Sequence, residues 1–327
     1  MSKRGEVFWT GLFLVGVVVL TGYLDPVQSQ EKYPARAIDI IIPFAPGAGT
    51  DLSNRIAAGF LRQKWGIPVN VISKPGGNTV PACLEVYSSK PDGYLILGDS
   101  VPSSSLLSVV VKQLPFKVKD RTFIGVANVT AMLLMVPSSS PIKTLQDAIA
   151  EAKKDPASFT WTSLGGASMQ DYVTRQFFKA TGIDVVKTKP IMSQGGSQAT
   201  TLTAGGHVKL GSGTTSGILA AFKSGMVRPL GVTGKSRHPD FPNVPTFEEL
   251  GYPVVTAQNW NGFSGPPNLP SSIVDVWDKA LQEMVKDPEV ITKLANIGST
   301  PLYMNGMATK EHVMKEAEEV EKLFSLK

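Results

Sequence analysis

The sequence has few of the residues that build metal centres and disulfide scaffolds. Among its 327 residues are one cysteine, Cys83, and three histidines. A single cysteine forms no internal disulfide and no multi-cysteine metal set, so a disulfide scaffold and a zinc ribbon are excluded. The histidines, His207, His238 and His312, are scattered, which further disfavours a metal site. We therefore expect no metal and no cofactor.

An excess of charge of one sign is also missing. Lys and Arg number 32 and Asp and Glu 27, and the resulting formal net charge of +5 comes without a basic block of the kind that binds nucleic acid. No nucleic-acid partner is expected, and the small positive excess favours anionic ligands mildly. The length suits a substantial core and two domains, at roughly 100 to 200 residues per domain.

The N-terminus is typical of a secretory signal peptide, residues 1–29. Lys3 and Arg4 precede an apolar run from Val7 to Leu20, and Ser29 supplies the small residue of a cleavage site. Cleavage would release an exported, periplasmic protein. The alternative is an uncleaved membrane anchor, because the run is only a little shorter than the roughly 20 residues that span a bilayer. No later segment is apolar enough to span one.

Short apolar runs alternate with Gly-rich loops and helical patterns in the rest of the chain. The run AIDIIIPF at 37–44 is typical of a strand covered on both faces. Further strands are expected at 69–72, 95–97, 132–136, 160–162, 184–187, 208–211 and 228–233. This alternation predicts an α/β fold with a parallel, doubly wound sheet. A Pro-rich return crossing at 238–253 and terminal helices close the chain.

The Gly-rich loops are the candidate functional elements. In open α/β sheets, ligands bind beyond the carboxyl ends of the strands, where free backbone N–H groups and helix dipoles suit a carboxylate. Nucleotide motifs fail here: Leu52 replaces the third glycine of a dinucleotide fingerprint, and Pro229 replaces the first glycine of a Walker A loop. The alternative is that these loops are only turns. Asp51 can likewise either cap the first helix or orient a ligand.

A set of ordered motifs covers essentially the whole mature chain. Tyr33-Pro34 is followed by AIDIIIPFAPGAGTD, VISKPGGN, SSKPDGYLILGDS, WTSLGGASMQDY, GGSQATTLTAGGHV and RPLGVTGKSRHPDFPNVPTFEELGYP. Together they resemble the Bug receptors, the solute-binding proteins of tripartite tricarboxylate transporters. The resemblance implies a type II periplasmic-binding-protein fold, in which two doubly wound α/β domains close on a ligand cleft. Domain 1 is expected at 30–135 plus 240–327 and domain 2 at 136–239, with hinges near 132–138 and 238–253.

The resemblance also implies a set of ligand-binding residues, because such receptors hold a carboxylate largely with backbone amides, hydroxyls and ordered waters. Carried over by position, these are Pro46, Gly47, Ala48, Gly49, Thr50, Asp51, Lys74, Pro75, Gly76, Asp99, Ser100, Ser163, Gly165, Ala167, Ser168, Gly195 and Ser197. Asp99 would repel an anion unless it points away or binds an amine. Lys209 departs from the family, which usually has Asp there; it adds a cation for a second carboxylate if it points into the cleft, and nothing if it points to solvent.

The leading hypothesis is an extracytoplasmic receptor, not an enzyme, that captures a small organic acid. As a monomer it would deliver the acid to the large and small permease subunits of a membrane transporter. A dicarboxylate, a tricarboxylate, an aromatic acid or an amino acid all fit. One alternative is a secreted α/β enzyme acting on such an acid, with His207 as the candidate base. Another is a receptor that presents its ligand to a membrane sensor.

Overall fold

The computed structural model describes residues 33–165, 168–193 and 196–324. The predicted signal peptide, Ala167 and Gly195 therefore lie outside the described residues. Tyr33–Lys327 group as one compact unit. Among the described residues, no helix combines the length and apolarity needed to cross a membrane.

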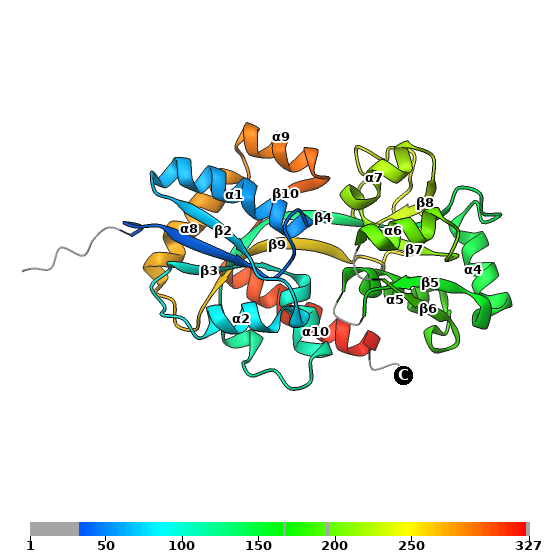
Figure 1. Ribbon diagram of the computed structural model, residues 1–327, viewed down its shortest axis with the longest axis horizontal. Helices are drawn as coiled ribbons and strands as arrows, with labels where there is room; N and C mark the ends of the chain where they lie inside the picture. Colours follow the sequence, from blue (N-terminus) through cyan, green and yellow to red (C-terminus); the bar gives the residue numbers. More distant parts are fainter. Residues whose placement is uncertain (1–32, 166–167, 194–195, 325–327) are drawn as a thin grey trace, which may run out of the picture. The chain divides into compact units, whose positions relative to one another are not determined.

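The elements of this unit alternate along the chain (Figure 1). The strands are β1 (Ile38–Ile42), β2 (Val69–Ser73), β3 (Leu95–Ser100), β4 (Thr122–Pro137), β5 (Thr160–Ser163), β6 (Lys189–Met192), β7 (Gly211–Thr214), β8 (Val227–Val232), β9 (Gln258–Gly265) and β10 (Ser299–Asn305). The α-helices are α1 (Gly49–Trp65), α2 (Val80–Tyr87), α3 (Ser105–Val110), α4 (Leu145–Lys154), α5 (Met169–Thr181), α6 (Gly196–Ala204), α7 (Thr215–Lys223), α8 (Ser271–Met284), α9 (Pro288–Asn296) and α10 (Gly306–Phe324). Short 3-10 turns lie at Gly77–Thr79, Val101–Ser103, Val118–Asp120, Pro156–Ser158 and Val185–Lys187.

The main sheet is mixed. Its strands follow the order β10-β4-β9-β3-β1-β2, and β1 runs parallel to β2 and β3. β9 pairs antiparallel with both β3 and β4, and β10 pairs antiparallel with β4. The predicted parallel arrangement is confirmed for β1 to β3 and for the separate pair β5 and β6, and is wrong for the rest. Because β1, β2 and β3 are parallel, the loops that follow them lie at one edge of the sheet.

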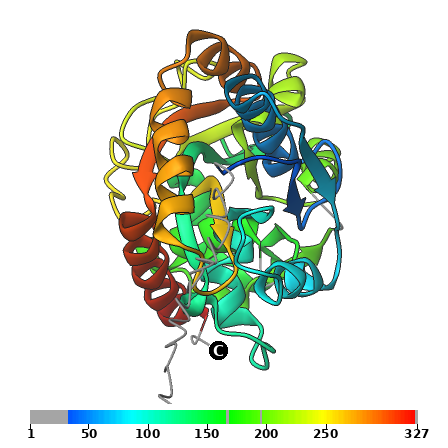
Figure 2. The ribbon, with the colours of Figure 1, turned by 90° about the vertical axis from the view of Figure 1, so that its left-hand side faces the viewer.

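Helices cover both faces of the sheet, as the isoleucine run predicts. Ile38, Ile40 and Ile42 pack with side chains of α1, α8 and α9, whereas Ile41 packs in a cluster with side chains of α2, α3 and α10. These two groups of helices lie on opposite sides of the strands in Figure 2. Successive side chains of a strand point to opposite faces, so a continuous apolar run is what a doubly covered strand requires.

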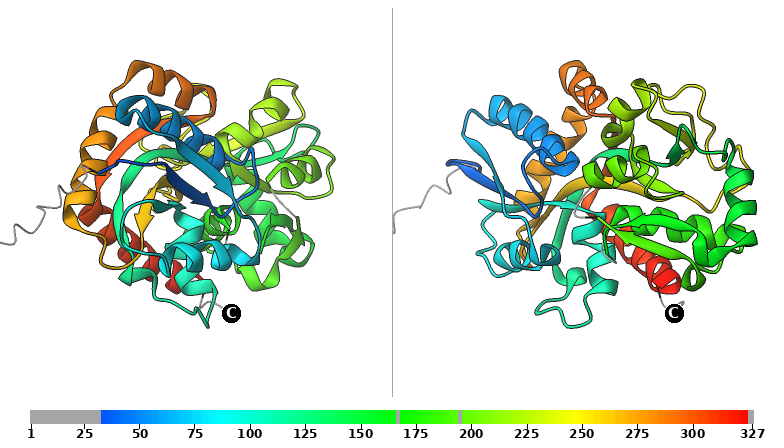
Figure 3. Two further views of the ribbon diagram at one scale, coloured as in Figure 1. Left: turned by 60° about the vertical axis from the view of Figure 1, so that its left-hand side comes forward. Right: turned by 45° about the vertical axis from the view of Figure 1, so that its right-hand side comes forward.

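β4 is the long strand that joins two sets of partners (Figure 3). Its residues 122–131 pair with β9 and β10, whereas residues 132–137 pair with β7 and β8. At Met132, where the partners change, the backbone amide donates to Thr233 Oγ1 at 2.9 Å, just after β8. The chain thus passes from one set of strands to the other without a break in the strand.

Two sequence predictions of strands are corrected. Residues 185–187 form a 3-10 turn because the Asp184 carboxylate accepts the Val186 amide, and β6 starts only at Lys189. The strand expected at 208–211 begins at Gly211. β9 was not predicted, because its sequence QNWNGFSG lacks apolar alternation; it is buried since it lies between β3 and β4.

Candidate functional site

The loop between β1 and α1 is braced by Asp51, which lies in the first turn of α1. Its carboxylate accepts the Gly47 amide at 2.9 Å, the Ser73 hydroxyl at 2.9 Å and two bonds from Arg55 at 2.9 and 3.0 Å. Burial acts to raise the pKa of Asp51, but the bonds from Arg55, Gly47 and Ser73 outweigh it, so the pKa lies below its usual value. Asp51 is thus an anionic brace that ties this loop to the end of β2.

The same loop leads into helix amides that have no intrahelical partner. The N-cap residue is Ala48, so Asp51 is not the N-cap, and the first intrahelical bond runs from the Leu52 amide to the Ala48 carbonyl. The amides of residues 49–51 precede that bond, at the positive end of the helix dipole. A Cβ added at Gly47 or Gly49 would meet nothing within 4 Å. The geometry suits an anion that approaches the backbone closely.

A second loop, between β5 and α5, has the same construction around Asp171. This carboxylate accepts the Ser163 hydroxyl at 2.7 Å, the Leu164 amide at 2.9 Å and the Ser168 hydroxyl at 2.6 Å. Ser168 is the N-cap of α5 and accepts the Asp171 amide in return. Burial raises the pKa of Asp171 above its usual value, and the bonds from Ser168 and Ser163 offset only part of that rise. Gly165 lies in this loop with φ +89°.

Sequence reasoning missed Asp171, although a signal for it was present. Ser168 followed three residues later by Asp171 is the spacing of a helix N-terminal capping pair. Each bracing aspartate also has an arginine four residues on, but only Arg55 bonds to its partner. Arg175 instead lies over the Phe324 ring at 4.7 Å, and its Nε is buried without a hydrogen-bond partner in the described part of the chain. The two braces therefore differ in how their charge is balanced.

Asp99 and Ser100, two of the predicted ligand residues, are bonded inside the protein. Both are 0% exposed. Asp99 accepts hydrogen bonds from the Ser100 amide and from the hydroxyls of Ser103, Ser104 and Ser264, at 2.6 to 2.9 Å. The Arg121 guanidinium lies 3.4 Å from the same carboxylate. The charge that seemed unsuited to an anion site in fact balances a buried arginine.

Lys209 forms an ion pair with Glu151. Its ammonium lies 2.7 Å from Glu151 Oε1 and 3.3 Å from the Ser158 hydroxyl, and its amide bonds to the Thr160 hydroxyl. Thr160 is the first residue of β5 and Ser163 the last, so Lys209 lies at the end of the strand away from the braced loop. An ion pair that is about one third exposed accounts for this lysine.

The remaining predicted residues lie around the two loops or outside the described residues. Pro46 is exposed, and Thr50 is buried within α1. Lys74 forms an exposed ion pair with Glu85, followed by exposed Pro75 and Gly76. Ser197 is exposed on α6, a separate helix. The Asp51 carboxylate thus links the loop between β1 and α1 to the end of β2, because it accepts hydrogen bonds from both Gly47 and Ser73. The Asp171 carboxylate links the two ends of the loop between β5 and α5 in the same way.

The histidine and cysteine side chains give the enzyme alternative little support. His207 is exposed on the turn after α6. Cys83 is buried, and burial raises its pKa to about 11, which leaves little thiolate at neutral pH. Across the described ranges, no three His, Cys, Asp or Glu side chains gather as a metal site would require.

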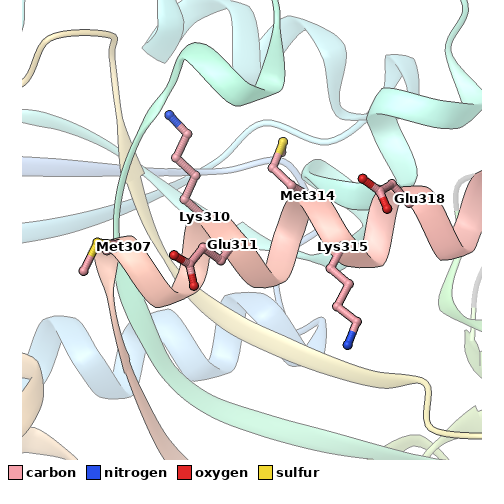
Figure 4. Close-up of a pocket in the computed structure, with 6 residues that line it drawn as sticks. All are labelled: Met307, Lys310, Glu311, Met314, Lys315 and Glu318. Carbon is pink, nitrogen blue, oxygen red and sulfur yellow. The ribbon is translucent and has the colours of Figure 1, made fainter.

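A shallow hollow on α10 is a poor ligand site (Figure 4). It is lined by Met307, Lys310, Glu311, Met314, Lys315 and Glu318, all from this one helix. Lys310, Met314 and Glu318 project to one side of the helix, and Glu311 and Lys315 to the other. Side chains that diverge in this way, with charges of both signs, do not converge on one small molecule.

An α/β unit with amide-presenting loops after its strands is the architecture of a periplasmic binding protein. The model of the family described as "Tripartite tricarboxylate transporter family receptor" matches residues 54–325. The chain belongs to this family of solute-binding receptors, as the ordered motifs predict.

Individual relatives agree with this assignment. The "UPF0065 protein in gbd 5'region" of Cupriavidus necator is 30% identical over 310 residues, which cover 91% of each chain. The solved structure of the periplasmic binding protein BugD is 25% identical with a TM-score of 0.76, over 90% of this chain and 98% of that one. R. palustris Rpa4515, solved with adipate, has a TM-score of 0.80 at 23% identity, over 90% and 98%. These likenesses confirm the predicted fold class.

Proposed function

We propose that this receptor captures a small carboxylate and delivers it to the permease subunits of a tripartite transporter. The observation that carries the proposal is the pair of loops braced by Asp51 and Asp171, each at the start of a helix. In each, the aspartate holds the backbone of the loop before the helix, and in the first loop the amides of residues 49–51 remain without an intrahelical partner. The adipate bound by Rpa4515 is a small carboxylate of the proposed kind.

The two loops would hold one ligand between two domains, 30–135 plus 240–327 and 136–239. β4 supports this arrangement, because it changes partners at Met132, within the proposed hinge 132–138. The ligand would favour the closed state only through contacts made to both domains. Asp51 and Asp171 would act by positioning amides, with Pro46, Gly47, Ala48, Gly49, Thr50 and Gly165 nearest the ligand, and Lys74, Pro75, Gly76 and Ser197 at its margin.

The site would work without catalysis and in the periplasm. The proposed export rests on the signal-like residues 1–29, and the structurally similar BugD is a periplasmic binding protein. We propose a monomer, because a cleft within one chain needs no second copy to complete it.

A thermal-shift screen of the mature protein, stripped of bound ligand, tests the proposal. A carboxylate at 100 times its dissociation constant should stabilise the fold by about 2.7 kcal/mol, because it binds only the native state. For a chain of this size that corresponds to several degrees. A saturable shift with organic acids and none with matched alcohols or amines is expected. A flat response from folded protein across the acids would contradict the proposal.

A further inference from the structure

The hydroxyl groups of the second loop cannot donate to a ligand as they stand. A serine hydroxyl has one hydrogen and two lone pairs. The Ser163 hydroxyl donates its hydrogen to Asp171 Oδ1 at 2.7 Å, and the Ser168 hydroxyl donates to Asp171 Oδ2 at 2.6 Å. Both hydrogens are therefore directed at the same buried carboxylate.

Each of these hydroxyl oxygens can still accept hydrogen bonds. Ser163 Oγ accepts the Gly165 amide at 3.2 Å, and Ser168 Oγ accepts the Asp171 amide at 3.2 Å. Counting only partners among the described residues, one lone pair is left on each oxygen. A lone pair turned towards a carboxylate oxygen is repulsive, whereas one turned towards an O–H or N–H group forms a hydrogen bond.

The hydroxyl hydrogens are held in place by the surroundings of Asp171. This residue is 2% exposed, and the Leu164 amide fixes Oδ2 as an acceptor. If the Ser168 hydroxyl turned outward, a buried oxygen of Asp171 would lose one of its hydrogen-bond donors. A ligand that accepted a hydrogen bond from Ser168 would have to compensate the free-energy cost of that loss.

We infer that this loop selects acids that carry a hydrogen-bond donor, a hydroxyl or an ammonium group, beside a carboxylate. The carboxylate would be held by the backbone amides of residues 49–51 in the first loop, and the donor would bond to Ser163 or Ser168. This inference rests on the proposed function. It makes Asp171 the residue that determines specificity, because Asp171 fixes the direction of both serine hydrogens.

Calorimetric titration with matched acids tests the selection. The probes are succinate with malate and aspartate, glutarate with 2-hydroxyglutarate and glutamate, and phenylacetate with mandelate and phenylglycine. Within the set that binds, we expect a donor-bearing acid to bind at least about tenfold more tightly than its unsubstituted partner, the size of a typical net hydrogen bond. Comparing the hydroxy acid with the amino acid identifies the donor. Equal or tighter binding of the unsubstituted acid would overturn the inference and leave the proposed function standing. If no acid binds, the proposed function fails and the inference falls with it.

An Asp171→Asn variant separates specificity from a structural role. Its amide nitrogen would donate to one serine, so that the hydrogen of this serine becomes free to face the ligand. We expect the preference for donor-bearing acids to shrink to less than about threefold, because a serine that can donate also accepts the unsubstituted acid. The matched control is Asp51→Asn, which should weaken all acids by a similar factor and keep the preference. An unchanged preference in folded Asp171→Asn would contradict the assignment. If that variant does not fold, the matched acids on the unaltered protein decide.

Discussion

Replacing Asp99 with alanine is expected to lower the free energy of unfolding by about 3–5 kcal/mol, the cost of removing one partner from a buried ion pair. Asp99 is the acceptor for three serine hydroxyls and lies 3.4 Å from Arg121 Nη2. Arg121 is 2% exposed, and its Nε and Nη1 already lack hydrogen-bond partners among the described residues. Loss of Asp99 would leave an uncompensated buried charge. Urea denaturation followed by circular dichroism measures the change.

The matched control is an exposed pair. Lys293 lies 2.6 Å from Glu289 on α9, and both side chains are more than half exposed. Glu289→Ala should change stability by well under about 1 kcal/mol, because solvent screens such pairs. If Asp99→Ala were as mild as this control, the carboxylate would not be neutralising Arg121, and the structural role of Asp99 would lose its basis.

Replacing Glu316 with glutamine is expected to stabilise the protein at alkaline pH. Glu316 on α10 is 7% exposed, and its Oε2 accepts bonds from the Ser105 hydroxyl and the Trp260 indole. Burial raises the pKa of Glu316 to about 7, from an ordinary value of 4.5, although the two bonds act in the opposite direction. The folded state therefore holds a proton that the unfolded state releases. A difference of this size corresponds to about 3 kcal/mol.

The direction of the pH dependence follows from these two pKa values. Below pH 4.5 the carboxyl group is protonated in both states and has no effect. Between pH 4.5 and about 7 only the unfolded state ionises, so this group lowers stability as pH rises; above that range the penalty is constant. Glu316→Gln should remove that fall and be more stable than the unaltered protein at about pH 8, while Glu318→Gln on the exposed face of α10 should not. If Glu316→Gln and the unaltered protein were equally stable in alkaline buffer, the buried carboxyl group would ionise without lowering the free energy of unfolding.

The sequence predicted the parts of the fold that follow from local pattern. The isoleucine run of β1 and the Gly-rich loop after it indicated a doubly covered strand and an anion-binding helix start. The prediction failed for β9, whose Asn, Trp and Gly residues have no strand periodicity. Trp260 and Asn261 of β9 find their hydrogen-bond partners in α10 and β4, far away in the chain. Only the three-dimensional structure brings these partners together.

The sequence indicated which loops carry the candidate site, but not how their side chains bond to one another. Gly47, Gly49, Ser163 and Ser168 were identified from composition and resemblance, since small and polar residues before a helix leave amides free. The direction of the serine hydrogens depends on Asp171, and the burial of the Asp99 charge depends on Arg121. The spacing of Ser168 and Asp171 signals the first of these contacts, whereas no spacing rule specifies the second.

Binding of one carboxylate by both loops, braced by Asp51 and Asp171, is the central proposal for this receptor. Calorimetric titration of the unaltered protein, Asp51→Ala and Asp171→Ala with the acid that gives the largest thermal shift tests it most directly. We expect one binding site per chain and a loss of affinity of at least about tenfold in each variant, because each would release the amides that hold the acid. Circular dichroism should show that both variants remain folded. Unaltered affinity in either folded variant would contradict the proposal.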